Sequence, residues 1–168
     1  VIVTEITGGT EKPARADWST VENPEIISAV QNAGKVDVTV KTNIGYDGAD
    51  KIEVAMSDAE GIVIGTAKSS KEGNEAAVSF TPAASGTYTF TVKAIRDGEE
   101  DKAGNSMNAD FVLPLTAPKI SSATNVGKGA VALEWSEVKE AEKYVVTVEG
   151  TDNKTESTTT AATISGLT

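Results

Sequence analysis

The sequence predicts an all-β protein, because apolar and polar residues alternate along most of the chain and no helical pattern persists. In each alternating run one face is apolar and the other polar, as in half-buried antiparallel strands. Clusters of Gly, Asn, Asp and Pro separate the runs and mark turns. We therefore expect antiparallel β-sandwiches.

The expected strands follow one another along the whole chain. The first covers residues 24–30, where β-branched residues precede a turn at 32–34. Alternating runs follow at 36–41, 51–56, 87–94, 131–135 and 144–149. Turn clusters are expected at 43–50, 57–61, 69–74 and 97–105.

A domain boundary is predicted near residues 113–118. Pro114 and Pro118 bracket this stretch, and proline cannot donate to a strand ladder. Roughly seven strands precede it, the number in a two-sheet sandwich, whereas the stretch after it is short for a self-sufficient core. We expect an N-terminal segment at 1–22, a complete sandwich at 23–115 and an incomplete one at 116–168.

The composition excludes several classes of function. The chain has no Cys and no His, which removes disulfides, thiolate or imidazole metal sites and triads that need these residues. Fifteen Lys and Arg face 25 Asp and Glu, so the net charge of −10 disfavours nucleic-acid binding. No apolar run approaches the ~20 residues of a membrane span. We expect no enzymatic activity, no nucleic-acid binding and no membrane insertion.

Acidic side chains gather in two of the expected loops, at 43–50 and 97–105. Ca²⁺ prefers six to eight oxygen ligands, although no twelve-residue calcium loop is present. Solvated acidic loops are the alternative, and no other cofactor is expected. The candidate Ca²⁺ ligands are Asp47, Asp50, Asp97, Glu99, Glu100 and Asp101, with Asn105 as a further oxygen donor.

Two aromatic residues, Trp18 and Tyr46, lie outside the regular strands and are candidate carbohydrate-binding residues. The alternatives are a hydrophobic plug for Trp18 and a side chain folded over the core rim for Tyr46. In a seven-strand sandwich the loops at 43–50 and 96–105 lie at the same end. We therefore expect one pole of the first sandwich to gather the acidic residues and Tyr46, with Trp18 beside them.

The second segment resembles a fibronectin type III domain. The resemblance is carried by residues 117–120, 131–135, 141–146 and 163–168, in that order and at suitable spacing. In that family a Trp of the second strand and a Tyr of the third pack in the core. The resemblance therefore implies that Trp135 is buried against Tyr144, together with Leu133, Val146 and Ile164.

The first segment resembles an Ig-like or fibronectin type III module. Residues 85–94 are similar to the sixth strand of these sandwiches and place Tyr88 at the tyrosine corner, where its hydroxyl bonds to nearby backbone. Residues 101–105 resemble a loop of bacterial extracellular Ig-like repeats. The segment lacks the second-strand Trp, and both families stay open.

These resemblances imply a secreted or cell-surface bacterial protein, in which such modules often stand beside domains that act on polysaccharides. The leading hypothesis is a non-catalytic spacer or docking element whose partners are neighbouring domains of a parent protein. One alternative is a carbohydrate-binding accessory module with a polysaccharide partner. Another is an adhesion or filament subunit that assembles by strand pairing.

The ends of the chain raise a further expectation. A type III domain needs two more strands after residues 166–168, and residues 1–7 read as a strand with no hairpin partner. We expect a fragment cut within modules at both ends. The alternative is that residues 1–7 complete the open sandwich of another copy.

Overall fold

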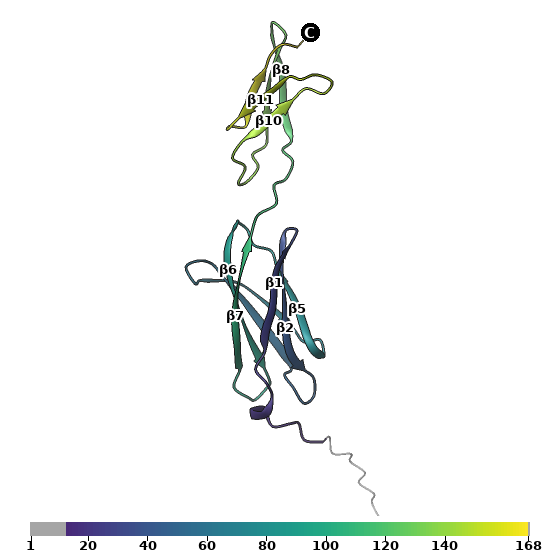
Figure 1. Ribbon diagram of the computed structural model, residues 1–168, viewed down its shortest axis with the longest axis vertical. Coiled ribbons are helices and arrows are strands. Elements are labelled where there is room, and N and C mark those ends of the chain that lie inside the picture. Colours follow the sequence, from purple (N-terminus) through teal and green to yellow (C-terminus); the bar gives the residue numbers. More distant parts are fainter. Residues whose placement is uncertain (1–12, 168) are drawn as a thin grey trace, which may run out of the picture. The chain divides into compact units, whose positions relative to one another are not determined.

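The computed structural model describes residues 13–167 (Figure 1). They divide into two compact units, unit 1 ending at Val112 and unit 2 beginning at Leu113. Apart from the short 3-10 helix η1 (Trp18–Thr20), all regular elements in the described part are strands, which confirms the all-β class. The strand expected at residues 1–7 lies outside the described residues.

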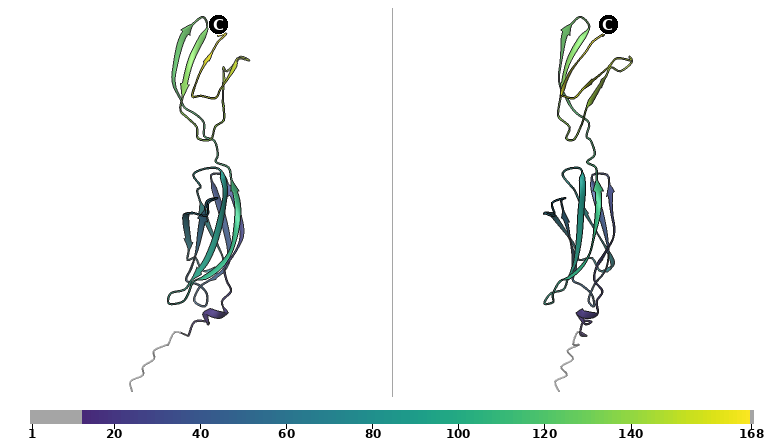
Figure 2. Two further views of the ribbon diagram at one scale, coloured as in Figure 1. Left: turned by 90° about the vertical axis from the view of Figure 1, so that its left-hand side faces the viewer. Right: turned by 60° about the vertical axis from the view of Figure 1, so that its left-hand side comes forward.

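Unit 1 is a sandwich of two antiparallel sheets, β1-β2-β5 and β4-β3-β6-β7 (Figure 2). The fourth strand pairs with the third, whereas in constant-type Ig domains it joins the other sheet. The strands are β1 (Glu25–Asn32), β2 (Lys35–Ile44), β3 (Lys51–Ser57), β4 (Val63–Ser69), β5 (Gly73–Phe80), β6 (Gly86–Ile95) and β7 (Lys102–Phe111).

The core of unit 1 follows from the alternation. Val36, Val38 and Val40 on β2 point inward and are fully buried. Phe90 on the opposite sheet is also fully buried, and its ring centroid lies 5.3 Å from that of Phe80. Successive strand residues point to opposite faces, so the apolar set of each strand meets between the sheets.

The tyrosine corner is present as expected. The Tyr88 hydroxyl donates a 2.8 Å hydrogen bond to the Ala84 carbonyl, while its ring is buried. The expected loop at 97–105 is too long, however, because β7 already begins at Lys102. Asn105 stands within this strand and bonds both the Ile26 amide (2.6 Å) and the Ile26 carbonyl (3.0 Å), which ties β7 to β1.

Unit 2 contains β8 (Ile120–Gly127), β9 (Ala130–Trp135), β10 (Tyr144–Thr147), β11 (Lys154–Ser157) and β12 (Ala161–Ile164). They form the sheets β12-β9-β8 and β10-β11. This arrangement repeats the first five strands of unit 1. Within residues 113–167, no strands correspond to β6 and β7.

The predicted core of unit 2 is present. Trp135 is 6% exposed, and its ring meets the Tyr144 ring edge-on with centroids 5.4 Å apart. Ile164 is also buried, and the Tyr144 hydroxyl accepts a 3.0 Å hydrogen bond from the Val138 amide. Leu133 and Val146 are only half-buried, because the two sheets do not fully cover each other.

Candidate functional sites

Residues 13–21, here called the strap, lie across the loops 45–50 and 96–101 at one pole of unit 1. Trp18 is 7% exposed and packs with Val21, Ala49 and Ala94. Its indole Nε1 donates a 2.8 Å hydrogen bond to the Glu100 carbonyl. Trp18 is therefore a plug that closes the end of the core, with its polar atom satisfied.

Arg96 holds this pole together. It is 4% exposed, and its guanidinium donates to the carbonyls of Gly48 (2.8 Å), Asp47 (2.7 Å) and Ala16 (2.7 Å). Its carbon Cζ also lies 4.7 Å from the Trp18 ring centroid. A buried charge needs such partners, and they come from both the strap and a loop of the sandwich.

Our sequence reasoning missed Arg96, although a signal was present. Tyr88, Phe90, Val92 and Ala94 point inward on β6, and Arg96 continues this phase directly after the strand ends. An arginine that follows an inward-facing series is directed toward the end of the core, where the long side chain reaches loop carbonyls.

A second arginine, Arg15, joins the strap to the loop 45–50. Its guanidinium forms a 2.9 Å ion pair with Asp50 and donates to the Gly48 carbonyl at 2.9 Å. The other Asp50 oxygen accepts a 2.8 Å hydrogen bond from the Asp97 amide. The Asp97 amide and the Arg15 guanidinium together lower the pKa of Asp50 below its ordinary value.

The structure does not assemble the expected Ca²⁺ ligands into a cluster. Asp47 accepts from the Ala16 amide at 3.0 Å, and Asp101 forms a 3.0 Å ion pair with Lys93. Among the described residues, no group of three or more acidic side chains is placed to hold a metal ion. The side chains of Asp97, Glu99 and Glu100 extend from an exposed loop.

The two candidate carbohydrate-binding residues differ in accessibility. Trp18 is buried by the strap and the loops, which contradicts a role as a platform for a sugar ring. Tyr46 is 37% exposed, and its hydroxyl donates to the Pro13 carbonyl. An open hollow of about 570 Å³ lies beside it, lined in part by Arg15, Ser70 and Glu72.

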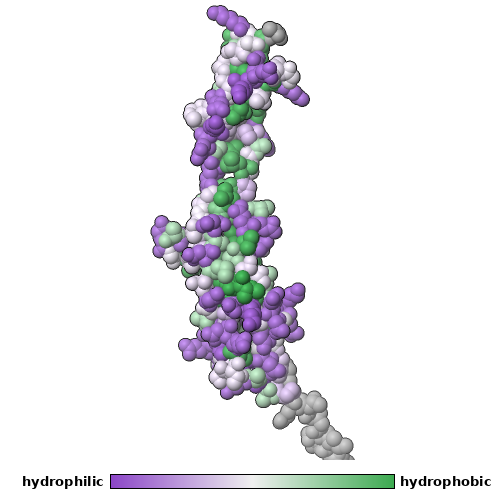
Figure 3. Space-filling model, in the orientation of Figure 1, coloured by the Kyte–Doolittle hydropathy of each residue, from purple (hydrophilic) through white to green (hydrophobic). Residues whose placement is uncertain are grey.

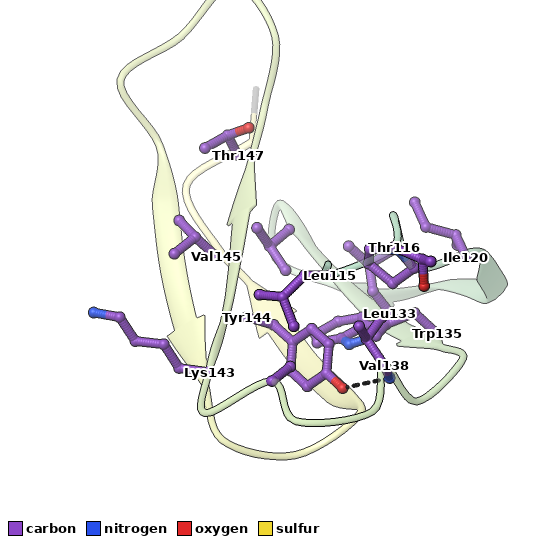
Figure 4. A pocket seen from close by; sticks show the side chains of 13 residues that line it. Leu115, Thr116, Ile120, Leu133, Trp135, Val138, Lys143, Tyr144, Val145 and Thr147 are labelled. Carbon is purple, nitrogen blue, oxygen red and sulfur yellow. Dashed lines mark hydrogen bonds between the residues drawn. The ribbon is translucent and has the colours of Figure 1, made fainter. Parts of the chain in front are cut away.

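A second candidate site is the groove between the two sheets of unit 2 (Figure 4). It has a volume of about 420 Å³. Leu115 and Ile120, which line it, are 63% and 67% exposed. Figure 3 shows hydrophobic surface on this unit between hydrophilic areas. The apolar lining is formed by Leu115, Pro118, Ile120, Leu133, Trp135, Val138, Ala141, Tyr144, Val145 and Val146.

Two polar features border this groove. Among the described residues, strand β10 pairs only with β11, whereas its counterpart β3 in unit 1 pairs with both β4 and β6. The indole Nε1 of Trp135 is buried and has no hydrogen-bond partner among the described residues. Both the strand edge and the indole N–H can donate to a further polypeptide segment.

No protein-family model matches the chain, and no curated protein matches it. Among solved structures, it is similar to a segment of two fibronectin type III domains from chicken tenascin, with a TM-score of 0.51 and 12% identity, covering 87% of this chain and 84% of that one. The chain has a fibronectin type III or Ig-like β-sandwich fold.

Two further solved structures match less well. The FN1–FN3 domains of chicken CNTN1 match with a TM-score of 0.34 and 12% identity, over 86% of this chain and 56% of that one. The BSP domain of a biofilm associated protein matches with a TM-score of 0.33 and 20% identity, over 86% and 24% of the two chains. Separately, none of the helices in the described residues is long and apolar enough to cross a membrane.

Proposed function

We propose that this chain is a non-catalytic spacer or docking element of a larger secreted or cell-surface bacterial protein. The observation that carries the proposal is the clamp on the strap. Arg96, Arg15 and Trp18 use their polar atoms to fix residues 13–21 against unit 1. A module that holds its incoming segment in one orientation transmits position between the parts that it joins.

The chemistry of the chain supports a non-catalytic role. Without Cys or His, the common nucleophile–base pairs are missing. The carboxylates with resolved contacts at the pole are paired with arginine, lysine or backbone amides rather than with each other. The resemblance to type III modules supports an extracellular parent protein, and a polysaccharide-active enzyme is the parent that we propose.

The second candidate function is carbohydrate binding at Tyr46. The specific observation in its favour is the open hollow, where an accessible aromatic ring stands beside Asp50, Ser70 and Glu72. A sugar needs an aromatic face and polar groups around it, and this hollow offers both on a small scale.

Two measurements test these proposals. Backbone amide relaxation by NMR is expected to show residues 13–21 as rigid as the strands of unit 1, and fast motion in this segment would contradict the clamp. Affinity electrophoresis in gels that contain plant or bacterial polysaccharides is expected to show no retardation of the chain. Retardation that disappears in Tyr46→Ala but persists in the control Tyr144→Phe would instead establish the carbohydrate-binding function.

A further inference from the structure

We infer that two side-chain amides, those of Asn105 and Gln31, carry tension through unit 1 by locking β1 to β7. This role rests on the proposed spacer function, because a spacer between anchored parts is pulled along its own chain. It deepens that function by assigning the resistance to two named side chains.

Strands β1 and β7 lie side by side although they belong to different sheets (Figures 1 and 2). Within the described residues, no backbone ladder joins them. Ile26 bonds Asn105, and further along both strands Gln31 bonds Val112, so the two strands run parallel. Side chains therefore hold this contact at two points, here called the amide clamps.

The first amide clamp is built where two β-bulges meet. The Ile26 amide donates to Asn105 Oδ1 at 2.6 Å, and Asn105 Nδ2 donates to the Ile26 carbonyl at 3.0 Å. On β1, Ile27 is the extra residue in the ladder with β2. On β7, Gly104 and Asn105 together stand opposite Val92. A bulge bends its strand and redirects a side chain, which here aims the Asn105 amide across to β1.

The second amide clamp lies at the other end of β1. Gln31 Nε2 donates to the Val112 carbonyl at 2.7 Å, and the Val112 amide donates to Gln31 Oε1 at 2.9 Å. The same Nε2 atom also donates to the Ala33 carbonyl at 2.9 Å, which holds the side chain in place. An amide that donates to and accepts from one backbone residue imitates the pairing of neighbouring strands.

The chain enters and leaves unit 1 at opposite poles. Residues 22–24 lead into β1 at the strap pole, and β7 also starts at that pole, directly after the loop 96–101, so Val112 leaves at the far pole (Figure 1). Tension between these two points pulls β1 and β7 past each other along their length. Both amide clamps are then loaded at the same time, and their four hydrogen bonds share the force.

Force spectroscopy on the full chain tests this role, with handles on introduced cysteines because the chain has no Cys. Handles at Glu22→Cys and Pro114→Cys, both exposed positions, load β1 and β7 in shear and leave the strap and unit 2 outside the loaded segment. Handles at Glu22→Cys and Glu99→Cys peel the two strands apart from the strap pole, so the amide clamps break one after the other. The shear arrangement is expected to unfold at the higher force.

Variants separate the amide clamps from general destabilisation. Asn105→Ala and Gln31→Ala each remove the two hydrogen bonds of one clamp, so each should accelerate unfolding in the shear arrangement about tenfold at constant force. The matched control is Asp58→Ala, which also removes two hydrogen bonds, from the amides of Glu60 and Ile62, but in the β3–β4 hairpin. It should leave this rate nearly unchanged, because the hairpin stays folded when β1 and β7 part.

Calorimetric unfolding of each variant supplies the loss of melting temperature against which the acceleration is compared. If Asn105→Ala does not fold, Gln31→Ala carries the test. Equal unfolding forces in the two handle arrangements would show that the β1–β7 contact is not loaded in shear. An unchanged rate in the clamp variants would assign the load to the backbone ladders alone.

One further outcome also overturns the role of the amide clamps. If Asp58→Ala accelerates shear unfolding as much as Asn105→Ala at a similar loss of melting temperature, the effect is a general loss of stability. None of these outcomes decides the spacer function itself, which is tested separately by the rigidity of the strap.

Discussion

Replacing Arg96 with Ala is expected to destabilise unit 1 markedly, because this side chain links the strap to the loops at its pole. The guanidinium makes three hydrogen bonds of 2.7–2.8 Å and is 4% exposed. A hydrogen bond to a charged group contributes about 1.5–3 kcal/mol, and removal of its donor leaves a desolvated acceptor. The contributions do not add, because the Ala16 and Asp47 carbonyls lie near the surface and regain water.

We therefore expect a loss of about 3 kcal/mol in the free energy of unfolding for Arg96→Ala. Arg96→Lys is expected to lose less free energy of unfolding than Arg96→Ala but to remain less stable than the unmodified chain, because a single ammonium does not reach carbonyls on the strap and the loop together. The matched control is Arg15→Ala, which removes a half-exposed guanidinium from the same pole and should cost about 1 kcal/mol or less.

The assay is calorimetric unfolding of both variants. Limited trypsin digestion is added for Arg96→Ala and the unmodified chain only, because trypsin cleaves after Arg15 once the strap detaches and the Arg15→Ala control lacks this site. Arg96→Ala should lower the melting temperature of unit 1 and accelerate this cleavage. If Arg96→Ala proves no more destabilising than Arg15→Ala, and the strap stays protected, the clamp is not what holds the strap.

Four further predictions follow from particular contacts. Trp135→Ala should destabilise unit 2 by about 3 kcal/mol in urea unfolding, since it removes a buried ring; a loss under 1 kcal/mol would contradict its place in the core. The pKa of Asp50 is lower in the folded state than its ordinary value of 3.8, so the ionised carboxylate contributes its full stabilisation above pH 3.8 and loses it as the pH falls through the folded-state pKa. In thermal unfolding measured over a series of acidic pH values, the melting temperature of Asp50→Asn should therefore fall less with decreasing pH than that of the unmodified chain. Gly48→Ala should destabilise unit 1 in thermal unfolding, because the new Cβ would lie 2.0 Å from the Asn43 carbonyl oxygen, whereas Gly34→Ala meets no atom within 4 Å and serves as control. Calorimetric titration with Ca²⁺ should give no binding heat and no change in melting temperature, and a saturable heat would restore the metal site.

Much of the fold was predictable because strand periodicity acts locally. Alternation placed Val36, Val38 and Val40 on one face before their partners were known, and the structure buries all three. The positions of Tyr88 and Trp135 were predictable by resemblance, because each occupies a defined place in a familiar sandwich.

Local reasoning was wrong where a distant segment decides the conformation. Gly104 and Asn105 are ordinary turn residues, yet both lie in β7. A Cβ on Gly104 would lie 2.0 Å from the Pro24 carbonyl oxygen, and the Asn105 side chain bonds the backbone of Ile26. Both residues therefore allow β7 to pack closely against the start of β1. Turn propensities do not describe this contact, because it depends on a segment far away in the sequence.

By itself the sequence determined the strand class, the acidic character of the loops and the absence of thiol and imidazole chemistry. Only the tertiary structure decided what the polar side chains at the pole do. Asp50 and Asp101 were candidate metal ligands by residue type, but in the fold they form ion pairs with Arg15 and Lys93. The sequence left Trp18 accessible in principle, but in the fold its ring packs on Ala49 and Ala94 and the Arg96 guanidinium lies against it. The physical reason is that side-chain chemistry is local, whereas the partner that satisfies a charge or covers a ring arrives from elsewhere in the chain.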